Sequence, residues 1–233
     1  MRSRRLEVKV IGLGGIGSAL VPFLARLLDA REPPPRLTLI DGDEFQAHNR
    51  VRQAFPAYGN KAIILTGEIA RTFDRLSVRA VPAYVREENV ASLVVEGDYA
   101  MLAVDNHPTR RIVSDHCSSL RDVVVISGGN ELTDGNVQVF IRRAGEERCA
   151  SLTRYHPEIA RAGDLLPAEG CDLRTSAEPQ LLVTNLAVAS AMLNAFHACL
   201  EGDIAYEEVY LDILAGKMNP VVRGGTRWLR SAP

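Results

Sequence analysis

A glycine-rich stretch near the start of the chain, Gly12-Leu13-Gly14-Gly15-Ile16-Gly17, joins an apolar run to an amphipathic one. The pattern Gly-x-Gly-x-x-Gly between a strand and a helix is typical of nucleotide-binding β-α-β units. Gly12 would make the tight turn, Gly14 would let the backbone approach a phosphate, and Gly17 would let the helix pack close to the strand. The first turn of the helix would offer free N–H groups to an anion. We therefore predict a nucleotide site, although the loop alone leaves open which nucleotide binds.

Asp41 and a group of downstream cations narrow the choice of nucleotide. Asp41 ends the second predicted strand, where its carboxylate can accept hydrogen bonds from ribose hydroxyls. The segment His48-Asn49-Arg50-Val51-Arg52-Gln53 follows, and Lys61 begins the next predicted helix. A dinucleotide needs no such cluster of cations, whereas a triphosphate needs them to neutralise its charge and to hold the leaving group. The cluster favours ATP, although Arg50 is equally well explained as a surface charge, and His48 is better explained as loop structure.

Asp105 follows a predicted buried strand, at the edge where open α/β sheets bind ligands. A carboxylate at this edge, near a phosphate site, is suited to be a single protein ligand of Mg²⁺. Arg110 lies five residues later, one turn into the next predicted helix. It would either face the same pocket or pair with a helix carboxylate such as Asp115, and the sequence leaves both roles open.

The elements that would position these side chains alternate between strands and helices. Short apolar runs predict strands, and runs with apolar residues three or four apart predict helices. The predicted strands are 8–11, 36–40, 77–81, 99–104 and 123–127, and the predicted helices are 15–31, 60–73, 87–96 and 107–121. This alternation predicts an α/β fold with a Rossmann-like, doubly wound and mostly parallel sheet. Residues 42–59 are polar and irregular, and we interpret them as a functional loop.

The pattern changes after Gly128. Residues 136–142 alternate as an exposed strand would, and residues 145–179 have no strong period. A helix over 180–200 and strands over 209–214 and 218–223 are expected to follow. We therefore expect one domain over 1–233, in which residues 8–130 form the nucleotide-binding half and residues 131–233 add a sheet extension and a mobile loop.

Charge and hydropathy exclude some partners. The formal net charge of −2 argues against broad binding to nucleic-acid phosphates. Residues 181–200 are long enough to suggest a membrane span, but Asn185, Asn194 and His197 interrupt them, so we expect a helix buried against the sheet. The first residues run straight into a predicted strand without a signal peptide, so we expect a cytoplasmic protein.

The four cysteines, at positions 117, 149, 171 and 199, are widely spaced and include no Cys-x-x-Cys pair. This spacing predicts neither a disulfide framework nor a structural zinc site. Cys117 and Cys199 lie on predicted helices and are expected to be buried, whereas Cys149 is ambiguous.

Five short blocks, in this order over residues 8–130, resemble the family of ThiF, MoeB and the ubiquitin-activating enzymes. They are Gly12-Leu13-Gly14-Gly15-Ile16-Gly17, Asp41-Gly42-Asp43, Asn49-Arg50-Val51-Arg52-Gln53, Lys61-Ala62, and Asp105-Asn106 followed by Arg110. Each block alone recurs widely, but the five together are specific. The resemblance implies an enzyme that binds ATP and Mg²⁺. It would transfer AMP to the C-terminal carboxylate of a ubiquitin-like or sulfur-carrier protein, usually one that ends in Gly-Gly.

The resemblance also implies a role for each block. Asp41 would hold the ribose, Arg52 and Lys61 would hold phosphates, and Asp105 would hold magnesium. The remaining pocket residues would be the loop glycines with Asp43, Asn49, Gln53, Asn106 and Arg110. A carboxylate nucleophile is ionised at neutral pH and needs no general base, so such a site would act by positioning and by stabilising charge.

The chain departs from the family in two respects. Many members supply an arginine from an N-terminal segment to the partner subunit, whereas here only Arg2, Arg4 or Arg5 precede the first strand; a homodimer is therefore an expectation. Many members also bind zinc through Cys-x-x-Cys pairs, which this chain lacks, so we expect no zinc.

Cys171 is the candidate nucleophile for a later thioester step. It lies in the irregular segment where the family often has a mobile crossover loop, although neighbouring Glu169 and Asp172 would disfavour a thiolate. A conjugating enzyme would then be a further partner. Two other functions stay open: an NAD-dependent oxidoreductase, which leaves Arg52, Lys61 and Asp105 unexplained, and a non-catalytic partner subunit with the same fold.

Overall fold

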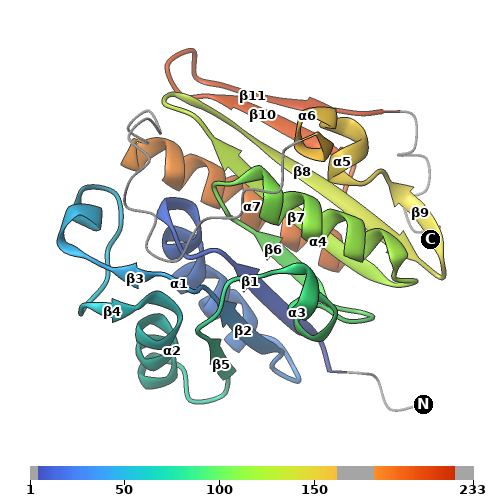
Figure 1. The fold of residues 1–233 in the computed structure, drawn as a ribbon. Helices are drawn as coiled ribbons and strands as arrows, with labels where there is room; N and C mark the ends of the chain where they lie inside the picture. The colour runs from blue at the N-terminus through green and yellow to red at the C-terminus, as the bar shows by residue number, and fades with distance from the viewer. Residues whose placement is uncertain (1–4, 162–180, 224–233) are drawn as a thin grey trace.

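The computed structural model describes residues 5–161 and 181–223, and a mixed β-sheet forms its centre (Figure 1). Half of the sheet is parallel, in the order β7 (Val123–Asn130), β6 (Tyr99–Leu102), β1 (Glu7–Ile11), β2 (Arg36–Ile40) and β5 (Ser77–Val81). The other half is antiparallel and continues from β7 through β8 (Asp134–Arg143), β10 (Glu208–Asp212) and β11 (Lys217–Val221), while β9 (Glu146–Cys149) pairs with β8. The predicted α/β fold, with C-terminal strands that extend a parallel sheet, is confirmed.

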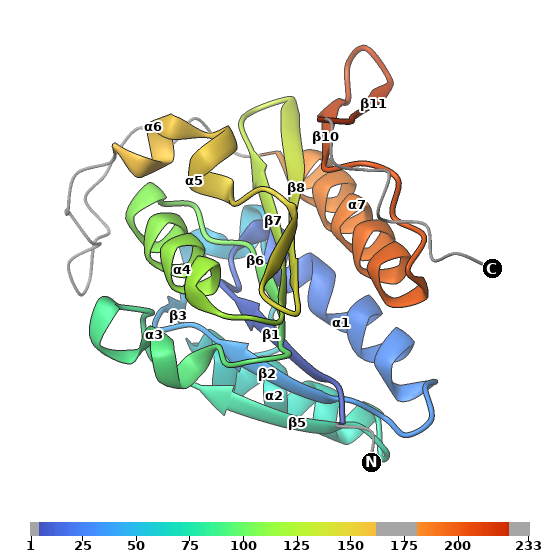
Figure 2. The same ribbon diagram turned by 90° about the vertical axis from the view of Figure 1, so that its right-hand side faces the viewer.

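Helices cover both faces of the sheet (Figures 1 and 2). On one face lie α1 (Gly15–Asp29), α2 (Lys61–Thr72) and α7 (Leu182–Glu201); on the other lie α3 (Glu87–Leu93), α4 (His107–Ser119), α5 (Leu152–Tyr155) and α6 (Pro157–Ala160). The alternation of side chains along each strand produces two cores. Val8 and Val10 of β1 belong to the core under α1 and α7, and Ile11 belongs to the core under α3 and α4.

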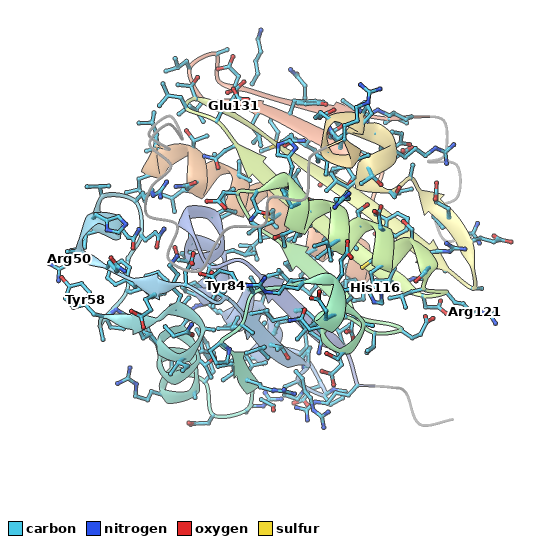
Figure 3. The ribbon with its side chains drawn as sticks, viewed as in Figure 1. Arg50, Tyr58, Tyr84, His116, Arg121 and Glu131 are labelled. Atoms are coloured by element: carbon cyan, nitrogen blue, oxygen red, sulfur yellow. The ribbon has the colours of Figure 1, made fainter. Side chains whose placement is uncertain are left out.

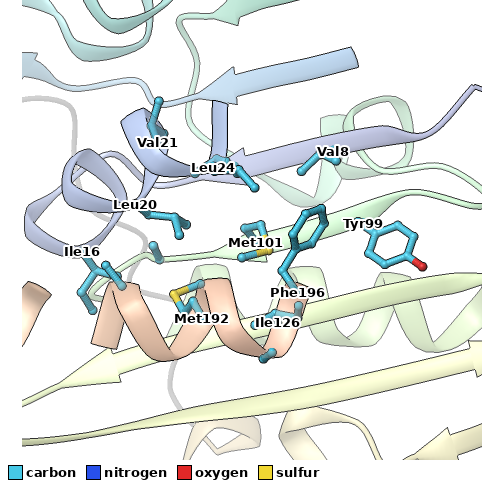
Figure 4. Close-up of a cluster of buried hydrophobic side chains, with 14 of the residues drawn as sticks. Val8, Ile16, Leu20, Val21, Leu24, Tyr99, Met101, Ile126, Met192 and Phe196 are labelled. Atoms are coloured by element: carbon cyan, nitrogen blue, oxygen red, sulfur yellow. The ribbon is translucent and has the colours of Figure 1, made fainter. Parts of the chain in front are cut away.

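The larger core lies between the sheet and the helices α1 and α7 (Figure 4). Leu20 and Leu24 of α1 and Met192 and Phe196 of α7 are fully buried. The ring of Phe196 meets Tyr99 of β6 edge to face, with centroids 5.7 Å apart. Burying side chains of this size stabilises the fold by about 1.5–3 kcal/mol each. Because α1 begins in the glycine loop, this packing also fixes the loop on the sheet.

Helix α7 is, within the described ranges, the one helix that is long and apolar enough to cross a membrane by length and composition. It packs against α1, β7 and β8, with Asn185, Val188, Met192 and Phe196 buried on the side that faces them. The helix therefore lies against the sheet, and the prediction of a buried helix rather than a membrane span is confirmed for this packing.

The exposed strand predicted over residues 136–142 is wrong in its exposure. β8 lies inside the sheet between β7 and β10, and residues 137–141 are buried. Val137 and Val139 face the core under α7, whereas Phe140 packs with Leu152 and Ile159 of α5 and α6. The sequence analysis did not predict that α5 and α6 cover this face of β8, because both helices lie in a segment that was predicted to be irregular.

The strand order reverses at β1, which has β2 on one side and β6 on the other. Ligands of open α/β sheets bind at such a reversal, at the carboxyl ends of the strands. The glycine loop follows β1 and Asp105 follows β6. A Cβ atom on Gly12 would lie 2.8 Å from the backbone of Ala103, so the two segments are in contact.

A buried ionic cluster joins the start of α6 to β10. The carboxylate of Glu208, which is fully buried, accepts hydrogen bonds from Nε2 of His156 at 2.7 Å and Nδ2 of Asn136 at 2.8 Å, and lies 2.5 Å from the guanidinium of Arg223. Burial alone would raise the pKa of Glu208, but these hydrogen bonds outweigh it and hold the pKa at about 2. The hydrogen bond to Glu208 in turn raises the pKa of His156.

This cluster predicts a stability that depends on pH. Because the folded-state pKa of Glu208 lies below its usual 4.5, its contribution is fully present above pH 4.5 and is lost as the pH falls towards 2. Because the pKa of His156 is raised, its contribution is present below its usual 6.5 and is lost above its folded-state value. Urea unfolding should show Glu208→Gln less stable than wild type by on the order of 3 kcal/mol at pH 5.5, with the gap narrowing below pH 4.5 and closing near pH 2. Glu158→Gln, on the exposed partner of His156, is the control with a small effect; a gap independent of pH would contradict the assignment.

Candidate nucleotide site

Gly12 and Gly17 have the steric roles that the sequence predicted, whereas the approach of a phosphate to Gly14 stays a prediction. Gly12 has a φ of +88°, in the left-handed region that favours glycine. A Cβ atom on Gly17 would lie 2.0 Å from the carbonyl oxygen of Gly12, so only glycine lets α1 approach the strand this closely. A Cβ atom on Gly14 would meet nothing within 4 Å among the described residues. Among the described residues, the backbone at Gly14 is therefore left open to a ligand.

The first turn of α1 is not capped by any side chain of the described residues. Gly14 is the N-cap and has no side chain to offer, and the Ser18 hydroxyl donates back to the carbonyl of Gly14 at 2.6 Å. The first N–H groups of a helix have no partner within the helix. They are available here to an anion, which the helix dipole also favours.

Asp41 ties the end of β2 to the glycine loop. Its side chain is buried, and its two carboxylate oxygens accept hydrogen bonds from the backbone N–H groups of Leu13 at 2.6 Å and Asp43 at 2.7 Å. Burial raises the pKa of Asp41, while the nearby Lys61 ammonium and these two N–H groups lower it. Each oxygen keeps a second lone pair. These lone pairs could still accept hydrogen bonds from ribose hydroxyls, so a ribose contact stays a prediction. The two backbone hydrogen bonds give the carboxylate a second role, which is to hold the glycine loop in shape.

Lys61 is held beside these carboxylates at the start of α2. Its side chain is 7% exposed, and Nζ lies 3.1 Å from a carboxylate oxygen of Asp43. The other oxygen of Asp43 accepts a hydrogen bond from the Tyr84 hydroxyl. Asn60 caps α2 and donates from Nδ2 to the carbonyls of Asp41 and Asp43, at 3.1 and 3.2 Å. Lys61 is thus a buried cation that is fixed by Asp43 and lies near Asp41.

Tyr84 and Asn60 are residues of this site that the sequence analysis missed. The ring of Tyr84 covers Gly42, where a Cβ atom would lie 2.6 Å from it. A signal was available for Tyr84, because it follows β5 at the same carboxyl edge of the sheet as Asp41 and Asp105. Asn60 carried the ordinary signal of a helix N-cap.

The segment predicted as a functional loop contains two short strands, β3 (Glu44–Phe45) and β4 (Gly59–Asn60), and the 3₁₀ helix η1 (Ala47–Val51). Asn49 is buried, and its Oδ1 accepts the backbone N–H of Gln46 at 2.9 Å. Arg50 is exposed, with its guanidinium 5.1 Å from the ring centroid of Tyr58 at the rim of the molecule (Figure 3). This placement favours the surface-charge explanation of Arg50, and leaves half-buried Arg52 as the inward candidate.

A hollow of about 560 Å³ lies beside η1. Gln53 is buried and lines it together with Phe45, Arg50, Phe55 and Glu68, and with Ala54 and Pro56. No residue of the glycine loop belongs to this described lining. A contact between Gln53 and the nucleotide stays a prediction.

Asp105 and Asn106 stand where β6 leads into α4. Asp105 is exposed, and Asn106 caps the helix, its Oδ1 accepting the N–H of Thr109 at 2.9 Å. Within the described part of the chain, no group of three or more His, Cys, Asp or Glu side chains is arranged to hold a metal. Mg²⁺ bound with a nucleotide needs only one or two protein carboxylates, because phosphate oxygens and water fill its other positions. Asp105 fits that requirement.

Arg110 has a role that neither alternative from the sequence described. Its guanidinium donates to the Ser127 hydroxyl at 2.7 Å and to the carbonyls of Val104 and Gly128 at 2.5 and 2.8 Å. Burial lowers the pKa of Arg110 to about 10, while the negative charge of Asp105 raises it and partly offsets this effect. The side chain therefore joins the ends of β6 and β7 beneath Asp105, and a direct nucleotide contact stays a prediction.

Residues 2–217, almost the whole chain, match a family model described as the ThiF family. The chain belongs to the ThiF family. The resemblance seen in the five sequence blocks is thereby confirmed.

Two relatives illustrate the range of this family. The tRNA threonylcarbamoyladenosine dehydratase of Haemophilus influenzae is 29% identical over 139 residues, which cover 57% of this chain and 51% of that protein. The molybdopterin-synthase adenylyltransferase of Salmonella typhimurium is 28% identical over 172 residues, 70% of this chain and 67% of that protein. The chain thus spans about half the length of the first relative and about two thirds of the second.

Among solved structures, E. coli MccB with ATP has a TM-score of 0.69 at 14% identity, covering 95% of this chain and 66% of that one. At this identity the likeness establishes the shared fold.

The described cysteines are poorly suited to nucleophilic chemistry. Cys117 and Cys149 are buried and Cys199 is half-buried, and burial raises the pKa of each thiol to about 12. The burial predicted for Cys117 is confirmed, and that of Cys199 is confirmed in part. Cys171 lies outside the described residues, as do Arg2 and Arg4, whereas Arg5 donates from Nε to the carbonyl of Pro34 at 2.6 Å.

Proposed function

We propose that this chain is an ATP-dependent adenylyltransferase that activates the C-terminal carboxylate of a ubiquitin-like or sulfur-carrier protein. The observation that carries the proposal is the buried Lys61 beside Asp41 and the uncapped start of α1. A helix N-terminus alone suits any phosphate. A cation fixed near Asp41, whose carboxylate binds the N–H of Leu13 in the glycine loop, suits the pyrophosphate that leaves an adenylation reaction.

In the proposed reaction, a carboxylate oxygen of the carrier attacks the α-phosphorus of ATP. The bond from this phosphorus to the bridging oxygen of the β-phosphate breaks, and pyrophosphate leaves with both electrons of that bond. No proton moves, because the attacking carboxylate is already ionised. The N–H groups of α1 would bind the phosphates, Lys61 and Arg52 would stabilise the departing charge, and Asp41 would orient the ribose. Asp105 would hold Mg²⁺, which supplies further charge neutralisation when bound.

The relatives support this class of reaction and also indicate a competitor. One relative carries the name of an adenylyltransferase, and MccB was solved with ATP. The dehydratase carries the name of an enzyme that acts on tRNA. The formal net charge of −2 disfavours a nucleic-acid substrate here. A homodimer in the cytoplasm, with a conjugating enzyme as a further partner, completes the proposal.

ATP–pyrophosphate exchange tests the proposal. Labelled pyrophosphate should enter ATP only when a carrier protein ending in Gly-Gly is present with Mg²⁺, and not when the carrier lacks its last two glycines. Tight binding of NAD without exchange would instead support an oxidoreductase. Binding of ATP without exchange on any such carrier would support a non-catalytic partner subunit.

We further propose that Cys171 accepts the activated carboxyl group. Its thiolate would attack the acyl carbon, and AMP would leave as the carbon–oxygen bond to the adenylate breaks. A carrier adduct should then appear on non-reducing gels, disappear with dithiothreitol, and be absent in Cys171→Ala. Cys199→Ala, which removes a half-buried thiol with a pKa of about 12, should keep the adduct. An adduct that persists in Cys171→Ala would assign the chemistry to another residue.

A further inference from the structure

Asn185, in the first turn of α7, is a fully buried polar side chain. It is fully inaccessible, and neither Nδ2 nor Oδ1 has a hydrogen-bond partner within the described part of the chain. Buried amide groups are nearly always hydrogen-bonded, because leaving them unpaired costs free energy. An unpaired carboxamide in a core therefore calls for an explanation other than stability.

The carboxamide lies directly against the glycine loop. A Cβ atom on Gly15 would be 2.2 Å from Nδ2, 2.6 Å from Cγ and 2.8 Å from Oδ1 of Asn185. The side chain thus fills the space beside the residue that begins α1, next to the open backbone of Gly14. Glycine at position 15 is what allows this approach, a reason that the sequence pattern did not give.

Hydrogen bonds of the neighbouring backbone and of Thr184 also fix the position of Asn185. Its backbone N–H donates to the carbonyl of Leu181 at 3.1 Å. The neighbouring Thr184 is buried and donates its hydroxyl to the carbonyl of Leu132 at 2.8 Å, in the turn between β7 and β8. Helices α1 and α7 run side by side (Figure 2). The carboxamide therefore presents a donor and an acceptor from a fixed support to a loop that no other described residue covers at Gly14.

We infer that Asn185 is a positioning residue for the nucleotide. A phosphate bound at Gly14 draws the first N–H groups of α1 towards it and turns the peptide groups of the loop. The carboxamide of Asn185 then pairs with those peptide groups and favours the bound arrangement of the loop. The inference rests on the proposed function, because it assigns a supporting residue to the same nucleotide site.

A leucine at position 185 separates positioning from folding. Leucine has nearly the same shape as asparagine and no polar atoms, so Asn185→Leu should fold and melt at least about 2 °C above wild type without nucleotide. Its Kd for ATP should rise by about 10-fold, the value of one or two lost hydrogen bonds. In the exchange assay the KM for ATP should rise by a similar factor while kcat changes little.

Two further variants complete the design. Asn194→Leu makes the same change on an exposed position of α7 and should leave the Kd unchanged. Asn185→Ala, which adds no bulk, should weaken ATP binding as the leucine variant does. Unchanged ATP affinity in both Asn185 variants would overturn the inference, and so would failure of both to fold, because the side chain would then be structural. If wild type itself binds no ATP, the proposed function fails first and the inference fails with it.

Discussion

Replacing Asp105 with asparagine is expected to lower the rate of ATP–pyrophosphate exchange by about 100-fold or more and to leave the melting temperature unchanged. The carboxylate of Asp105 is exposed after β6, and the buried guanidinium of Arg110 beneath it keeps its three protein hydrogen bonds when the charge of Asp105 is removed. Its proposed task is to hold Mg²⁺ against the phosphates, and asparagine keeps the shape but loses the charge. A loss of 100-fold corresponds to about 3 kcal/mol of transition-state stabilisation.

The measurement is exchange with saturating carrier protein over a range of Mg²⁺ concentrations, together with thermal unfolding. Asp115→Asn is the matched control: it makes the same change on an exposed position of α4, ten residues further on, and should retain activity. An Asp105→Asn enzyme with wild-type exchange would remove this residue from the magnesium site. A large loss of melting temperature would show that the carboxylate supports the fold instead.

Local patterns were sufficient to predict the parallel half of the fold. The alternation of strands and helices, and the glycines at positions 12, 14 and 17, each reflect a constraint within a few residues of chain. Asp41 and Asp105 could be placed at the ligand edge because they directly follow predicted strands. These predictions needed no knowledge of which segments pack together.

Contacts between segments that are far apart in the chain could not be predicted from local sequence patterns. Asn185 and Gly15 are 170 positions apart, and only the packing of α7 on α1 makes them neighbours. The burial of β8 depended on α5 and α6, which are too short to show a period. The contacts of Arg110 with Ser127 and Gly128 could not be predicted for the same reason, since these partners lie on β7, apart from Arg110 in the sequence.

The glycine loop yields the second large prediction, because two of its positions should fail in opposite ways when changed to alanine. In Gly17→Ala the new Cβ atom lies 2.0 Å from the carbonyl oxygen of Gly12, which is backbone and has little freedom to move. We expect this variant to lose about 3 kcal/mol of stability, and with it about 6–12 °C in melting temperature. In Gly14→Ala the new atom meets no described residue within 4 Å, so the loss of stability should be much smaller.

The Gly14→Ala change, which should cost little stability, should have the larger direct effect on nucleotide binding. The methyl group of Gly14→Ala occupies the space through which a phosphate would approach, so ATP should no longer raise the melting temperature of this variant. Gly67→Ala is the matched control: it places the same methyl group in open space on α2, where replacing a helical glycine should add about 0.5–1 kcal/mol of stability and leave the ATP response intact. If Gly14→Ala responds to ATP like wild type, the phosphates do not lie over this loop. The fold would then stand, and the nucleotide would have to bind elsewhere along the carboxyl edge of the sheet.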